Sequence, residues 1–124
     1  MSLMSIRLEL GRTDGFPNGD RSHGYEFLAP LTGDGHIDHE RWIRIKHDCL
    51  VRRFEAGQPD EHGLLRRVGQ GWRFDFDSAR SDDDEPFYKL DRHTISPGLY
   101  VSVTEHDGIQ RPFKIVSVTP AGGR

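Results

Sequence analysis

Hydrophobic side chains at every second position most restrict how this chain can fold. Between residues 72 and 77, aromatic residues alternate strictly with charged ones. A period of two is typical of a β-strand that buries one face and exposes the other. Similar segments, alternating or rich in hydrophobic residues, occupy residues 4–10, 25–31, 49–55, 64–68, 87–90, 99–104 and 113–119. We therefore expect a mainly β protein.

Turn-forming residues separate these segments. Gly69-Gln70-Gly71 and Asp107-Gly108 each predict a hairpin, and residues 57–60 predict a break between strands. Residues 12–22 and 78–86 are expected to be exposed loops. About seven short strands joined in this way predict a small antiparallel barrel or strongly curved sheet, SH3-like or related, with one short helix.

The helix is expected at residues 38–47. Asp38 can cap it, and Trp42, Ile45 and Cys49 follow at helical spacing. The alternative is a long strand in which residues 43–51 alternate. Charged residues of good helix propensity favour the helix over the strand.

The length of the chain predicts one folding unit. We expect a single domain, 1–124, because the chain of 124 residues is too short to build a second hydrophobic core. Residues 1–3 are interpreted as a cloning remnant and residues 120–124 as a flexible tail. Hydrophobic residues make up only 34% of the chain, so the core should be thin and rich in rings. Burial against a second copy would supplement it, and we predict a homodimer.

Charge and cysteine content restrict the partners and the compartment. The net charge of −3 supplies no overall attraction for a polyanion, so nucleic acid is not the expected partner. Cys49 is the only cysteine and cannot form an internal disulfide. The first residues do not resemble a secretory signal, which favours a cytoplasmic location. No hydrophobic run approaches the roughly 20 residues needed to cross a bilayer, so no membrane role is expected.

Two groups of residues suggest metal binding. Imidazole and thiolate ligands are available for zinc, but paired cysteines are lacking, so we favour no metal site. The acidic run 82–85 lacks the alternating spacing of a calcium loop and is expected to be solvated. The candidate zinc ligands are His36, His39, His47 and Cys49.

Charge is segregated along the chain. Residues 41–73 contain eight basic and four acidic side chains, whereas residues 75–91 contain two basic and seven acidic ones. We expect arginines of the first segment to form cross-strand ion pairs with Asp75 and Asp77. The alternative is a basic face on which Trp72 and Phe74 stack a base or hold an acidic partner. The aromatic residues alternate with the charged ones, which favours a core strand.

Catalytic motifs are not recognisable. The chain contains no G-x-S-x-G, H-E-x-x-H, G-x-x-x-x-G-K-[ST] or G-x-G-x-x-G sequence. A thiolate pair of Cys49 with His47 would require both side chains to lie together on a strand. The sequence leaves enzyme activity undecided and favours a binding role.

One segment resembles a known family. Ile95-Ser96-Pro97-Gly98-Leu99-Tyr100-Val101, followed by Arg111-Pro112-Phe113-Lys114-Ile115, is similar to the flavin-binding barrel of ferredoxin reductases. The resemblance implies a flavin held by the second strand. It departs from the family at Lys114, where the family has serine, and residues 1–124 do not include the family's nicotinamide domain. Turns at Pro97-Gly98 and Asp107-Gly108 explain both segments without a cofactor, and none is predicted.

The sequence therefore predicts a non-catalytic binding or protein-interaction module whose partner is an unknown protein or small molecule. The alternatives are a metal- or flavin-dependent enzyme, or nucleic-acid binding through the arginine-rich strands. Loops and strand ends on a rigid scaffold usually carry function. The candidate binding residues are Arg66, Arg67, Tyr88, His93 and Arg111.

Overall fold

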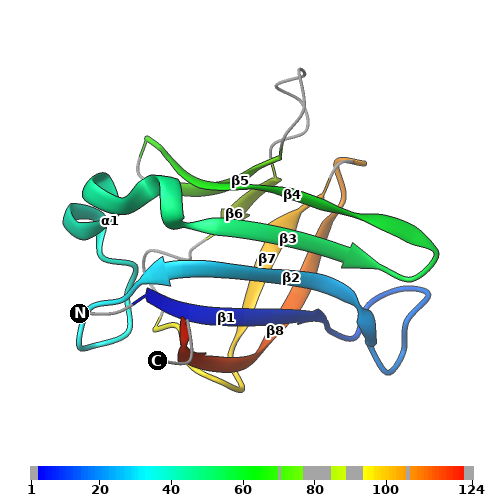
Figure 1. Cartoon of the computed structure of the whole chain (residues 1–124). Helices are drawn as coiled ribbons and strands as arrows, with labels where there is room; N and C mark the ends of the chain where they lie inside the picture. The colour runs from blue at the N-terminus through cyan, green and yellow to red at the C-terminus, as the bar shows by residue number, and fades with distance from the viewer. Residues whose placement is uncertain (1–2, 70, 77–84, 89–93, 106, 122–124) are drawn as a thin grey trace.

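A computed structural model describes residues 3–69, 71–76, 85–88, 94–105 and 107–121 and confirms a mainly β fold with one short helix (Figure 1). No helix in these described ranges is long and hydrophobic enough to span a membrane. The elements are β1 (Leu3–Leu10), β2 (Asp20–Pro30), α1 (His39–Ile45), the 3₁₀ helix η1 (Lys46–Asp48), β3 (Leu50–Glu55), β4 (Gln58–Val68), β5 (Gly71–Phe76), β6 (Glu85–Tyr88), β7 (Tyr100–Thr104) and β8 (Gln110–Pro120).

The strands form a closed antiparallel barrel. Each strand pairs with the next one in the chain, and β8 pairs back with β1. Among the barrels that the sequence allowed, this is the up-and-down type, in which sequential neighbours are joined by hairpins or short connections. Among the described residues every strand pairs on both sides, although β6 contributes only two residue pairs to each neighbour, and closure of this kind reduces the sheet edge open to another chain.

The hairpin between β3 and β4 is tighter than the sequence suggested. Glu55 pairs with Gln58, so Ala56 and Gly57 alone form the turn. Gly57 has a φ of +81°, a left-handed conformation that glycine adopts without strain. The predicted break at 57–60 is therefore wrong for residues 58–60, which belong to β4. Pro59 is tolerated there because it is only the second residue of the strand.

Several other boundaries differ from the prediction. β2 begins at Asp20, inside the predicted loop 12–22. Leu3 belongs to β1 and pairs with Pro30, although residues 1–3 had been given no structural role. Pro120 pairs with Met4 at the end of β8, in the segment expected to be a tail. β6 includes residues 85–86 of the predicted loop 78–86.

The helix prediction is confirmed, and the strand alternative for residues 43–51 is wrong over its first part. Asp38 accepts a hydrogen bond from the backbone N–H of Arg41 at 3.1 Å, which satisfies one of the unpaired donors at the start of α1. Trp42 is the buried residue of this helix, and its indole Nε1 donates to the carbonyl of Leu65 at 3.1 Å. The helix is thereby fixed against β4.

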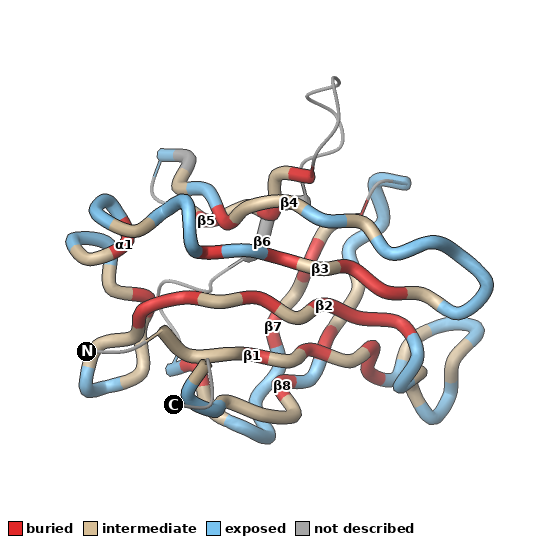
Figure 2. Tube along the Cα trace, in the orientation of Figure 1, coloured by how far each residue is buried: buried red, intermediate tan, exposed pale blue. Residues whose placement is uncertain are grey.

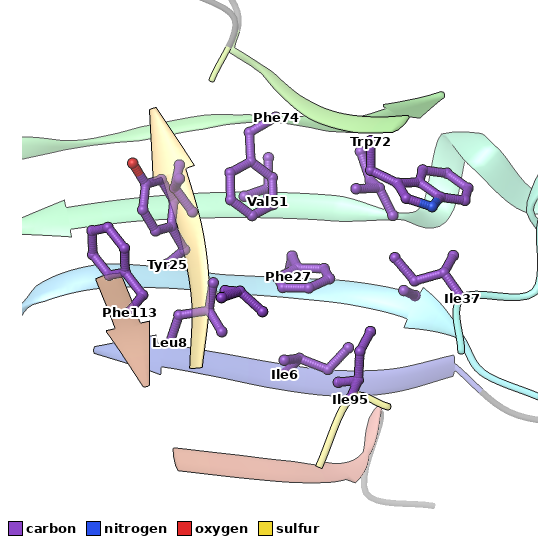
Figure 3. Close-up of a cluster of buried hydrophobic side chains, with 14 of the residues drawn as sticks. Ile6, Leu8, Tyr25, Phe27, Ile37, Val51, Trp72, Phe74, Ile95 and Phe113 are labelled. Carbon is purple, nitrogen blue, oxygen red and sulfur yellow. The ribbon is translucent and has the colours of Figure 1, made fainter. Parts of the chain in front are cut away.

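The interior of the barrel is filled by its own aromatic side chains (Figure 3). Along the strands, buried residues alternate with more exposed ones, as the tube in Figure 2 shows. Tyr25 stacks on Phe74 with ring centroids 4.7 Å apart, and Phe113 meets Tyr25 edge-on at 5.2 Å. Trp72 and Phe74 are at most 1% exposed, so these rings cannot stack a base from solvent. The expectation of a core strand at 72–77 is confirmed for residues 72–76, and Asp77 lies outside the described residues.

Candidate functional site

The two ends of the barrel are closed in different ways. Helix α1 lies at one end, at the left of Figure 1, and the β1–β2 loop and the β3–β4 hairpin lie at the other. We call the second end the mouth. It contains a pocket of about 510 Å³. The pocket is lined by Phe16, His23, Arg53, Glu55, Gln58, Pro59, Asp60, Glu61, Glu105, Asp107 and Arg111.

The floor of the mouth is a polar layer built on the hydrophobic core. Side chains two residues apart on a strand point to the same face, so a strand that continues past the core adds one more inward position. On four segments that position carries a polar or charged residue. The pairs, with the core residue first, are Tyr25 and His23, Val51 and Arg53, Val103 and Glu105, and Phe113 and Arg111. The sequence pattern thus directs these four polar or charged groups inward at the mouth.

Glu105 is the centre of this layer. Its Oε2 accepts hydrogen bonds from the Tyr25 hydroxyl at 2.7 Å and from Nη2 of Arg53 at 2.9 Å, and the His23 Nε2 lies 2.9 Å away. Its Oε1 accepts from Nη1 of Arg111 at 2.9 Å. Glu105 is 3% exposed. One carboxylate therefore ties together residues from β2, β3 and β8.

The ionisation of Glu105 is fixed by these partners. Burial alone would raise the pKa of the carboxyl group, but hydrogen bonds from His23 and Tyr25, together with the charge of Arg53, lower it to about 2. A group with this pKa stays ionised at neutral pH and is a poor proton donor. Glu105 therefore supplies a fixed negative charge.

The two arginines of the layer are held by further carboxylates nearer the solvent. Arg111 forms a bidentate pair with Asp107, at 3.1 Å and 2.9 Å, and its hydrogen bond lowers the pKa of that carboxyl group. Arg53 donates to Glu55 at 3.1 Å. Bidentate and charge-assisted pairs hold both partners in one orientation. The side chains of the polar layer are thus each held by more than one charged or polar partner.

The lining of the mouth carries an excess of negative charge. Five of its residues are carboxylates and two are arginines, and His23 adds positive charge only when protonated. Arg52, outside the lining, donates to Asp60 at 2.9 Å and offsets one carboxylate. Negative charge still exceeds positive charge after that pair is counted. The lining of the mouth is therefore negatively charged overall.

The candidate binding residues do not form one site. Arg111 belongs to the mouth. Arg66 and Arg67 lie on β4 beside Leu65, near α1 and away from the Gln58 end that borders the mouth. Tyr88 lies in β6 and pairs with Ser102, and His93 falls outside the described residues. The structure separates Arg111 from the other two arginines.

Among residues that the structure describes, no group of three or more His, Cys, Asp or Glu side chains is placed to hold a metal. The ring of His39 stacks on Trp42 at 5.8 Å instead. Cys49 is buried, its thiol donates to the carbonyl of Ile45 at 3.6 Å, and burial raises its pKa to about 11. A thiolate pair with His47 is therefore wrong, because the thiol stays protonated at neutral pH. Residues 82–84 of the acidic run lie outside the described part of the chain.

The predicted arginine pairs are found in part. Arg66 donates to Asp75 on the neighbouring strand at 2.8 Å, as expected for cross-strand pairing. Arg52 instead contacts Glu26 and Asp60, and Arg53 turns inward to Glu105. Asp77 falls outside the described residues.

The segment that resembles the flavin-binding barrel has a structural explanation. Gly98 has a φ of +95°, and the backbone N–H of Leu99 donates to the carbonyl of Ser96 at 3.3 Å, which makes a tight turn. Tyr100 is 55% exposed on the outer surface, whereas Arg111 is engaged by carboxylates in the mouth. The two halves of the segment therefore serve different surfaces.

Sequence reasoning missed most of the mouth. His23, Arg53, Glu55 and Glu105 were not proposed as site residues, because they are far apart in the chain and lie in otherwise ordinary strands. The available signal was their position: each of the three buried ones falls two residues beyond a core residue, on the same face. Comparison of the chain with known protein families, curated proteins and solved structures finds no match. Function is therefore inferred from the geometry of the mouth.

Proposed function

We propose that this protein is a binding module that holds a small, positively charged polar molecule in the mouth of the barrel. The observation that supports this proposal is a pocket of about 510 Å³ whose lining has five carboxylates and only two arginines. Pockets of this volume are typical of small-molecule sites, and the mouth of a barrel is a common position for them.

A binding role fits the state of the polar layer better than catalysis does. Glu105 is held ionised, and Arg53 and Arg111 are each bound by two carboxylates. Groups fixed in this way hold charge and orientation and do not exchange protons near neutral pH. Their rigidity lowers the entropy lost when a ligand binds.

The lining also indicates the shape of the ligand. Phe16 is held at the mouth by two backbone hydrogen bonds with Thr13, at 2.8 Å and 3.1 Å. Pro59, in β4, also belongs to the lining. A ring and a proline give a hydrophobic contact, and ring faces attract cations. An ammonium or guanidinium group on a short carbon chain satisfies both parts of the lining.

The proposal is tested with agmatine, a short chain that carries a guanidinium and an ammonium group. Titration calorimetry is expected to give a dissociation constant below about 1 mM, corresponding to roughly 4 kcal/mol. The matched zwitterionic probe is 4-guanidinobutyrate, which keeps the guanidinium group but has a carboxylate in place of the ammonium group. We expect it to bind at least about five-fold more weakly, because it meets the excess carboxylates.

Two variants locate the binding. Glu61→Gln removes one charge from the lining and is expected to weaken agmatine binding several-fold. Glu40→Gln makes the same change at an exposed position of α1, at the other end of the barrel, and should leave binding unchanged. Equal affinity for the two probes, no agmatine binding at millimolar concentration, or equal effects of the two variants would each contradict the proposal.

A further inference from the structure

Another hollow lies at the α1 end of the barrel, where α1 and η1 meet β4. We call it the basic hollow; its volume is about 330 Å³. β4 runs from the mouth at Gln58 to this hollow at Arg67, a span of about 30 Å at the usual rise per residue. The lining is Trp42, Lys46, His47, Leu64, Leu65, Arg66 and Arg67.

The charge of the basic hollow is opposite to that of the mouth. Every ionisable side chain in its lining is basic, and none is a carboxylate. Asp75 pairs with Arg66 at 2.8 Å and offsets that charge, but it lies outside the lining. The positive charges of Lys46 and Arg67 therefore exceed the negative charge nearby. The hollow therefore attracts carboxylates.

Two of these cations are positioned by buried tryptophan rings. The Arg67 guanidinium lies 5.0 Å from the centre of the Trp72 ring, and Nζ of Lys46 lies 5.7 Å from that of Trp42. Contacts of this kind hold a charged group in place without neutralising its charge. The indole of Trp42 is itself fixed by its hydrogen bond to Leu65. The hollow is thus partly organised in advance of binding.

Beside the cations is a hydrophobic strip. Leu64 is half-buried in the lining and pairs across the strands with Leu50, which is 53% exposed. Both point outward, because their neighbours Leu65 and Val51 point into the core. An aliphatic side chain of a partner can therefore pack next to its own carboxylates.

We propose that the basic hollow docks an acidic peptide segment of another protein, with an aliphatic side chain placed against Leu64 and Leu50. A peptide fits these features better than a nucleic acid does. Trp42 and Trp72 are 8% and 1% exposed, so no ring face is presented for base stacking. The whole chain carries a net charge of −3, which disfavours a long polyanion. A short acidic segment needs only the local positive charge.

The test uses a fluorescently labelled, capped hexapeptide in which glutamate alternates with leucine, and measures its binding by anisotropy. The control peptide has glutamine in place of glutamate. Single-stranded oligothymidylate of the same length tests the nucleic-acid alternative. We expect the glutamate peptide to bind most tightly and the glutamine peptide at least about five-fold more weakly.

Two charge reversals locate the contact. Lys46→Glu is expected to weaken binding of the glutamate peptide about five-fold or more. Lys114→Glu makes the same charge change at an exposed residue of β8 outside the hollow and should change the affinity less than about two-fold. Circular dichroism confirms that both variants are folded.

Four results would overturn the proposal: no binding of the glutamate peptide, equal binding of the two peptides, equal effects of the two reversals, or tighter binding of the oligonucleotide. Agmatine and the glutamate peptide are expected to bind at different ends of β4. The two proposals are therefore tested independently, and failure of one does not affect the result for the other.

Discussion

Among single residues, Glu105 is the most important for holding the polar layer together. It is nearly fully buried and contacts Tyr25, His23, Arg53 and Arg111. Arg53 is 9% exposed, and its pairing with Glu105 offsets the cost of burying the guanidinium charge. Loss of the Glu105 charge would leave Arg53 with Glu55, nearer the solvent, as its carboxylate partner.

We expect Glu105→Gln to lower the free energy of unfolding by about 3–5 kcal/mol, the usual cost of removing one partner of a buried ion pair. Asp14→Asn, an equivalent change on an exposed loop, should change it by less than about 0.5 kcal/mol. Urea denaturation at neutral pH measures both values. Similar stabilities for the two variants would show that the polar layer does not stabilise the fold.

Glu105 also makes stability depend on acid. Its pKa is about 2 in the folded protein against an ordinary value of 4.5, so the unfolded chain takes up the proton first as the pH falls. Its contribution, on the order of 3 kcal/mol, is complete above about pH 5 and is lost progressively between pH 5 and pH 2. Denaturation of the wild-type protein across this range should show the loss. The Glu105→Gln profile should be flatter, and parallel profiles would contradict this assignment.

Single residues were the hardest level to predict from the sequence. Cys49, a candidate zinc ligand by residue type, is buried and behaves as a small hydrophobic residue instead. Glu105 was not recognised, because it follows β7 just before a turn and looks like an ordinary surface residue. Its role depends on Arg53 and His23, which only the folded barrel brings near.

At the level of elements, close contact between β4 and β5 depends on Gly63. A Cβ atom at this position would lie 2.1 Å from the carbonyl oxygen of Asp75 and 2.6 Å from Cα of Phe76, both backbone atoms. The neighbouring backbone cannot yield without disturbing strand pairing. Only glycine allows the two strands to approach this closely.

Gly63→Ala is therefore expected to destabilise the protein by about 1–3 kcal/mol through overpacking. Gly33→Ala is the matched control, because nothing lies within 4 Å of the added Cβ and the residue is exposed. We expect the control to be within about 0.5 kcal/mol of the wild-type protein. Thermal unfolding compares the two variants, and equal midpoints would show that the strands can separate to accommodate a methyl group.

Strands with strict alternation were predicted well, and their ends were not. The segment 72–77 alternates rings and charges, and its buried face is the one expected. β4 was placed six residues too late, because Pro59 and the charged residues after it look like a loop. In the barrel these residues pair with β3 at the rim, where water solvates the outward charges. Tertiary pairing outweighs local propensity there.

For the whole molecule, opposite charges at the two hollows are the main property of the fold. β4 connects them: its first residues border the carboxylate-rich mouth, and Arg66 and Arg67 border the basic hollow. The net charge of −3 conceals this separation, because it averages both ends. The sequence did show basic and acidic segments, but linear order did not reveal which residues would share a surface.

The most direct test of a cation-binding mouth is an amide chemical-shift map of the isotope-labelled protein during titration with agmatine. We predict concentration-dependent shifts at Gly57, Glu61, Asp107 and Arg111, with signals of α1 and of Arg67 unchanged. Shifts centred on the basic hollow, or no saturable shift at the mouth, would contradict the account.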